Sequence, residues 1–153
     1  MMLQLFEGLD ITEESASWMA SGMRALAACD GFHTAELALI DEFERGLNIE
    51  PTDGGDFDVR TCPFDVPEAR EVFVRSLQLM ALADGRQSSR EEAWIDRACE
   101  CLGIATQRKD ELEREAKKFL LSSLAGVTAF RAQAVSIGES LGLSAADIDE
   151  VLG

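Results

Sequence analysis

The chain has 153 residues, 46% of them hydrophobic, and a net charge of −15 from 29 acidic and 14 basic side chains. This length and composition fit a single globular domain over residues 1–153 that buries its own core, and no apolar run approaches the roughly 18 residues that a membrane span needs. The acidic balance argues against a nucleic-acid partner and against adsorption to anionic lipid, because both need a basic surface.

Apolar residues recur at helical spacing along most of the chain, and no segment shows the sustained alternation of a strand. The helices predicted from this spacing cover residues 12–29, 34–47, 68–83, 90–102, 109–124, 128–141 and 145–152. Each of them carries one apolar stripe that must be buried against its neighbours. The pattern therefore predicts an all-α fold, a compact bundle of about seven helices.

Several residues mark where these helices begin and end. Glycines that suit the position after a helix are Gly31, Gly85, Gly103 and Gly142. Ser88 and Glu91 have the spacing of a capping box at the start of a helix. Ser144 is the expected N-cap of the last helix.

Residues 48–67 form an irregular stretch that contains all three prolines of the chain. We expect a long surface loop there, between two helical halves. Asp53, Asp56 and Asp58 make it a second candidate cation site, although neither register of an EF-hand loop supplies the final glutamate. A solvated acidic loop is the simpler interpretation.

The two helical halves repeat one another at a separation of 54 residues. Each half contains an alanine-rich helix, an Asp-Gly turn and a second helix with a glutamate near its start and an isoleucine four residues later. These residues are Asp30, Gly31, Glu36 and Ile40 in the first half, and Asp84, Gly85, Glu91 and Ile95 in the second. The pattern predicts a duplicated helical hairpin, with one residue fewer between Asp and Glu in the first copy.

This repeat resembles the signature of the tellurite-resistance TerB-like domain family. The second half carries it in Leu82-Ala83-Asp84-Gly85, followed by Glu91 and Ile95, and departs from it at Gln87, where the family has a β-branched apolar residue. The resemblance implies a compact bundle of about seven helices and a role in bacterial stress physiology. It further implies action beside membrane-associated partners or with metal ions, and it implies no catalytic reaction.

Asp30, Glu36, Asp84 and Glu91 are the candidate metal ligands. If the repeat brings the two hairpins together, these carboxylates converge, and oxygen ligands alone favour Ca²⁺, Mg²⁺ or Mn²⁺. The alternative is local. Each aspartate then accepts N–H bonds from the start of the next helix, and each glutamate caps that helix.

The chain has four cysteines, which we expect to be reduced and structural in a cytoplasmic protein, because the N-terminus lacks the features of a secretory signal. A zinc site built from Cys29, His33, Cys62 and Cys99 is a less favoured alternative. Trp18 and Trp94 are expected to be core or half-buried anchors rather than ligand platforms.

The expected function is that of a non-enzymatic, acidic interaction module of bacterial stress physiology that responds to cations and has a protein partner. The resemblance implies that this partner is membrane-associated. The alternative is a divalent-cation binding protein that uses the Asp-Gly carboxylates. A metal-dependent enzyme is less favoured, because His33 is the single histidine. The sequence requires no cofactor, and a divalent cation is the candidate.

Overall fold

The computed structural model describes residues 2–31, 34–51, 54–82, 88–125 and 131–153. Within these ranges the regular structure is entirely helical, so the predicted all-α bundle of about seven helices is confirmed. The α-helices are α1 (Glu13–Cys29), α2 (Thr34–Gly46), α3 (Pro67–Ala81), α4 (Ser89–Leu102), α5 (Thr106–Ala125), α6 (Arg131–Ser140) and α7 (Ala145–Leu152). Two 3-10 helices that the periodicity did not predict are η1 (Met2–Phe6) and η2 (Val59–Thr61).

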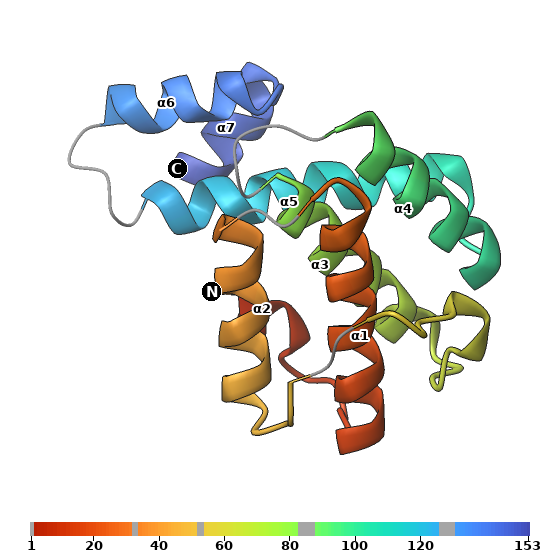
Figure 1. The fold of residues 1–153 in the computed structure, drawn as a ribbon. Helices are drawn as coiled ribbons and strands as arrows, with labels where there is room; N and C mark the ends of the chain where they lie inside the picture. Colours follow the sequence, from red (N-terminus) through yellow and green to blue (C-terminus); the bar gives the residue numbers. More distant parts are fainter. Residues whose placement is uncertain (1, 32–33, 52–53, 83–87, 126–130) are drawn as a thin grey trace.

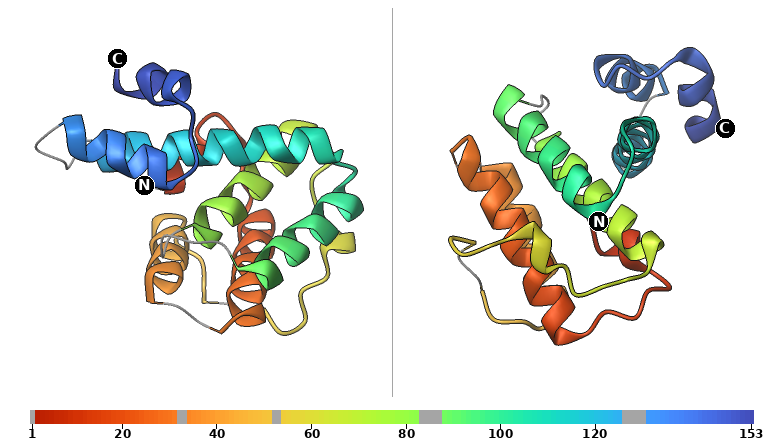
Figure 2. Two further views of the ribbon diagram at one scale, coloured as in Figure 1. Left: turned by 90° about the horizontal axis from the view of Figure 1, so that it is seen from above. Right: turned by 90° about the vertical axis from the view of Figure 1, so that its right-hand side faces the viewer.

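Helices α1 and α2 form one hairpin and α3 and α4 the other, and α1 contacts α3 and α4 as well as α2. Helix α5 crosses beside these hairpins, and α6 and α7 lie on its other side (Figures 1 and 2). Leu112 and Leu120 of α5 belong to the main core, whereas Leu121 packs with Leu143 and Ile148 in a smaller C-terminal cluster. Helix α5 thus joins the two hydrophobic clusters.

The two hairpins bury equivalent positions of the repeat. Pairs separated by 54 residues in α1 and α3 are Met23 and Leu77, Leu26 and Met80, and Ala27 and Ala81, all buried. In α2 and α4 the equivalent isoleucines, Ile40 and Ile95, are both 0% exposed. The repeat seen in the sequence is therefore a repeat of core positions.

Two aromatic side chains pack tightly against Gly22 of α1. A Cβ atom at this position would lie 2.7 Å from the ring of Phe73 and 2.9 Å from that of Phe57. The equivalent position in α3 is Ser76, which is also small and fully buried, and its hydroxyl donates to the carbonyl of Phe73 at 2.6 Å. Small residues at both positions leave room for the aromatic rings between the hairpins.

The residues predicted to begin or end helices do so at the positions that the structure describes. Positive φ angles are found at three of the four predicted glycines, Gly31 (+79°), Gly103 (+76°) and Gly142 (+80°), while Gly85 lies outside the described residues. Ser88 and Glu91 form the expected capping box. Ser144 caps α7 and accepts a hydrogen bond from the backbone N–H of Asp147 at 3.1 Å.

The segment between α2 and α3 differs from a solvated surface loop. The rings of Phe57 and Phe64 lie 4.9 and 5.3 Å from that of Trp18, which also contacts Phe73 at 4.8 Å. Trp94 of α4 stacks on Phe57 at 5.9 Å. The segment therefore inserts aromatic side chains between the hairpins, where burial of a large ring stabilises the packing. Both tryptophans are half-buried anchors, as predicted.

Candidate functional site

The two repeat glutamates occupy the same position in their helices. Glu36 is the third residue of α2 and Glu91 the third residue of α4, and each is only 1% exposed. A carboxylate near a helix N-terminus is stabilised by the helix dipole. Glu91 also accepts from the backbone N–H of Ser88 at 3.5 Å, so the expected local capping role is present in the second hairpin.

Cys29 is the last residue of α1, and nearby carboxylates influence its thiol. Burial and the negative charges of Glu91, Asp30 and Glu36 raise the pKa of its thiol to about 11, while Arg97 acts in the opposite direction. These carboxylates come from the end of α1 and from the first turns of α2 and α4. The ends of α1 and α4 concerned lie on the same side of the molecule (Figure 1).

The negative charges of Asp30, Glu36 and Glu91 thus act on one thiol, and Asp84 lies outside the described residues. Within the ranges that the structure describes, no group of three or more His, Cys, Asp or Glu side chains is close enough to hold a metal ion. The described carboxylates therefore do not form a cation site on their own.

In the acidic loop, the carboxylate of Asp58 pairs with Arg60 rather than being free for a cation. This carboxylate accepts a hydrogen bond from the backbone N–H of Arg60 at 3.0 Å and two from its guanidinium, both at 3.0 Å. These bonds lower the pKa of Asp58 below its usual value. Asp58 is the N-cap of η2, whereas Asp53 lies outside the described residues.

The cysteines have separate environments. Burial, together with the nearby Asp96 carboxylate, raises the pKa of Cys99 to about 11 against the effect of Lys109. Cys62 donates to the carbonyl of Phe64 at 3.5 Å. All four thiols are free. The zinc alternative has no support among the described residues, and its fourth member, His33, is not one of them.

A buried ion pair was not anticipated from the sequence. Arg24 of α1 and Glu44 of α2 pair at 2.6 Å, with side chains only 16% and 4% exposed. The equivalent positions in the second hairpin are Gln78 and Cys99, which are buried and uncharged. An alignment of the two repeats would have revealed this difference, because it places charged residues in the first half opposite uncharged residues in the second.

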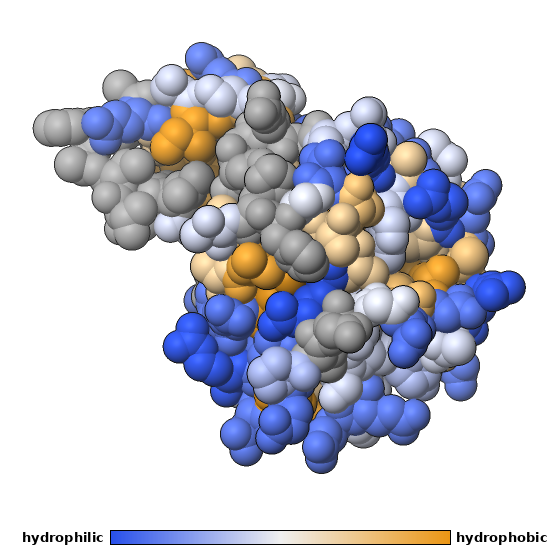
Figure 3. Space-filling view, viewed as in Figure 1, coloured by the Kyte–Doolittle hydropathy of each residue, from blue (hydrophilic) through white to orange (hydrophobic). Residues whose placement is uncertain are grey.

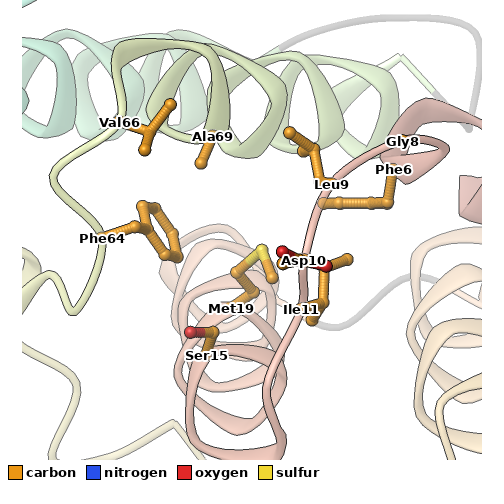
Figure 4. A pocket seen from close by; sticks show the side chains of 10 residues that line it. All are labelled: Phe6, Gly8, Leu9, Asp10, Ile11, Ser15, Met19, Phe64, Val66 and Ala69. Carbon is orange, nitrogen blue, oxygen red and sulfur yellow. The ribbon is translucent and has the colours of Figure 1, made fainter.

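An apolar pocket was also missed. It has a volume of about 260 Å³ and lies among η1, α1, α3 and the segments that connect them (Figure 4). Its lining includes Leu9, Met19, Phe64 and Val66, with Asp10 and Ser15 as polar members. Because the lining residues come from two distant stretches of sequence, 6–19 and 64–69, no local pattern identifies the pocket.

Comparison with protein-family models, curated proteins and solved structures gives no match in any of the three. Among the helices described here, none combines the length and apolar character needed to cross a membrane.

Proposed function

We propose that the chain is a non-enzymatic acidic interaction module that binds a protein partner, in the stress physiology of bacteria as its TerB-like repeat suggests. The observation that carries this proposal is the distribution of charge. Many basic side chains are paired with the chain's own carboxylates, while an excess of acidic side chains stays exposed.

The intramolecular pairs extend across the whole fold. They include Arg24 with Glu44, Arg75 with Glu115, Arg108 with Glu71, Lys109 with Asp96, Arg114 with Asp147, and Lys118 with Glu150. Pairing of this kind leaves the net charge of −15 to the remaining acidic groups. Hydrophilic residues accordingly cover much of the face over α1 and α2 (Figure 3).

The N-terminal part of the chain shows the clearest excess. Residues 2–23 contain Glu7, Asp10, Glu13 and Glu14, all exposed, and no lysine or arginine. The next basic residue, Arg24, is paired with Glu44. An uncompensated negative surface attracts basic partners and accelerates their association.

The proposal is tested by affinity capture from the bacterium that carries the gene. A variant that neutralises Glu7, Asp10, Glu13 and Glu14 to their amides is compared with one that neutralises the exposed Glu92, Glu100, Asp110 and Glu139. Both variants lose the same charge. A partner that is captured by the wild type and the second variant but lost by the first supports the proposal. Capture of no partner, or equal loss from both variants, contradicts it.

A second candidate function is the binding of a divalent cation at the hairpin ends, where the negative charges of Glu91, Asp30 and Glu36 all act on the Cys29 thiol. Thermal unfolding with a chelator and then with Ca²⁺, Mg²⁺, Mn²⁺ or Zn²⁺ tests it. An ion at 100 times its dissociation constant stabilises the fold by about 2.7 kcal/mol, which is several degrees. A shift with one ion that Asp84→Asn abolishes supports the site, and no shift with any ion refutes it.

A further inference from the structure

The apolar pocket has the size of a site for one side chain. Its volume of about 260 Å³ is below the roughly 300–1,000 Å³ of pockets that enclose drug-sized ligands. In Figure 4, Phe64, Met19 and Leu9 approach the same space from different elements, with Val66 and Ala69 above it. Such a lining favours an aliphatic or aromatic group over a polar one.

Val66 extends the apolar surface beyond the pocket. It is 52% exposed, and the other large hydrophobic side chains that the structure describes are buried or half-buried. Val66 also precedes α3 as an N-cap residue without a side-chain hydrogen bond. The pocket and this exposed side chain together form a short apolar surface.

Acidic residues are frequent at and beside the pocket-lining positions of the sequence. Asp10 lines the pocket, and four exposed carboxylates lie next to lining residues in the sequence, namely Glu7, Glu14, Asp65 and Glu68. Residues 61–69 contain no basic side chain. The nearby Arg70 donates instead to the carbonyls of Phe64 at 3.0 Å and Leu102 at 3.1 Å. An occupant must therefore combine an apolar group with positive charge.

We propose that this pocket docks a basic, amphipathic segment of a partner protein, which inserts one apolar side chain beside Met19 and Phe64. Lysine or arginine side chains of the segment then face Asp10 and the neighbouring carboxylates. The inference rests on the proposed interaction function and assigns the surface and the partner chemistry. Charge complementarity selects this occupant, because a second copy of the chain, an anionic lipid and a fatty acid are all repelled by the acidic surroundings.

The probe is a synthetic helical peptide of leucine and lysine, observed by NMR of the protein with ¹³C-labelled methionine methyl groups. Met19 lines the pocket, and Met80, buried in α3, is the internal control. Two further peptides serve as controls, one with glutamate in place of lysine and one with alanine in place of leucine. We expect the leucine–lysine peptide to shift the Met19 signal, with an affinity that falls as salt is raised.

Two protein variants locate the binding. Ala69→Phe fills the pocket and is expected to weaken binding at least tenfold, whereas Ala105→Phe adds the same ring at an exposed position outside it. Asp10→Asn should weaken binding several-fold and reduce its salt dependence. Circular dichroism and thermal unfolding verify that each variant is folded.

Equal binding to Ala69→Phe and wild type, equal binding of the glutamate peptide, or an unchanged Met19 signal overturns the inference. A Met19 shift caused by zwitterionic lipid vesicles or by raising the protein concentration, but not by the peptide, also overturns it and assigns the pocket to lipid or to a second copy. If the peptide fails while the captured partner still requires the N-terminal carboxylates, the pocket inference fails and the proposed function stands.

Discussion

Nη2 of Arg24 in α1 lies 2.6 Å from Oε1 of Glu44 in α2, and the Arg24 Nε donates to Oε2 at 3.2 Å. This two-pronged pair holds the first hairpin together where both side chains are largely removed from solvent. Asp41, which is 57% exposed, adds a weaker contact to Arg24 at 3.7 Å. The second hairpin has no such pair at the equivalent positions, so the first depends on charge where the second does not.

Glu44→Leu is expected to destabilise the fold, because it leaves the Arg24 guanidinium buried without its main partner. The loss should lie near the lower end of the roughly 3–5 kcal/mol typical of broken buried pairs, since Asp41 remains nearby. Urea unfolding measures it. The double variant Arg24→Met with Glu44→Leu should regain most of the stability.

A matched exposed pair provides the control. Glu150→Leu removes the partner of Lys118 at a site where Glu150 is 67% exposed, and such surface pairs contribute about 1 kcal/mol or less. If Glu44→Leu costs no more than Glu150→Leu, the buried pair is not a main stabilising contact of the first hairpin.

The thiols should react with iodoacetamide in a definite order. Cys101 is exposed, whereas the pKa values of Cys29 and Cys99 are raised to about 11, so at neutral pH little of either is the reactive thiolate. We expect Cys101 to be alkylated first and Cys29 and Cys99 far more slowly. Mass spectrometry of the time course measures the three rates.

Glu91→Gln should accelerate the alkylation of Cys29, because Glu91 is the largest electrostatic contribution to its raised pKa. Burial is the larger cause overall, so the increase should be partial. Glutamine preserves the capping-box geometry, which keeps α4 intact. Glu92→Gln changes the same charge at the exposed neighbouring position, and an equal acceleration there would show that Glu91 does not act on Cys29 directly.

The bond between Arg114 and Asp147 predicts a specific pH dependence. Hydrogen bonding from Arg114, with smaller effects of Ser144 and Lys118, holds the pKa of Asp147 at about 2, below its usual 3.8. A carboxyl whose pKa falls on folding stabilises the fold above its unfolded pKa, and this contribution is lost as the pH falls through the folded value. Asp147→Asn should therefore be less stable than wild type at pH 7, and the difference should shrink between about pH 4 and pH 2.

Denaturant unfolding at a series of pH values measures this difference. Asp110→Asn, at an exposed position of α5, is the control and should differ little from wild type at any pH. A difference for Asp147→Asn that stays constant down to pH 2 would show that its carboxylate charge does not stabilise α7.

Gly22→Ala should destabilise the protein although alanine favours a helix over glycine by about 1 kcal/mol. The new Cβ would lie 2.7 Å from the fully buried Phe73 ring, and overpacking of a core typically costs about 1–3 kcal/mol. Thermal unfolding measures the change. Combining it with Phe73→Leu should relieve part of the loss, and a stabilised single variant would mean that α1 and α3 separate easily.

The helices and most of their boundaries were readable from the sequence because their causes are local, although α5 begins at Thr106, three residues before its predicted start. Apolar spacing, the capping box of Ser88 and Glu91, and the N-cap of Ser144 each act within a few residues of the chain. The repeat added a longer-range prediction, that of a duplicated helical hairpin. The 3-10 helix η1 was not predicted, because a five-residue segment is too short to show helical periodicity.

The sequence by itself determined the helical class, the duplicated hairpins and the acidic character of the protein, because composition and short-range pattern decide these properties. Only the tertiary structure decided that the charges of Glu36 and Glu91 act on Cys29. It decided that Arg24 pairs with Glu44, and that Asp58 accepts hydrogen bonds from Arg60. It also decided the pocket beside Met19 and Phe64. Apart from Asp58 with Arg60 and Glu36 with Cys29, these arrangements join residues that are distant in the chain, and their geometry depends on how whole helices pack.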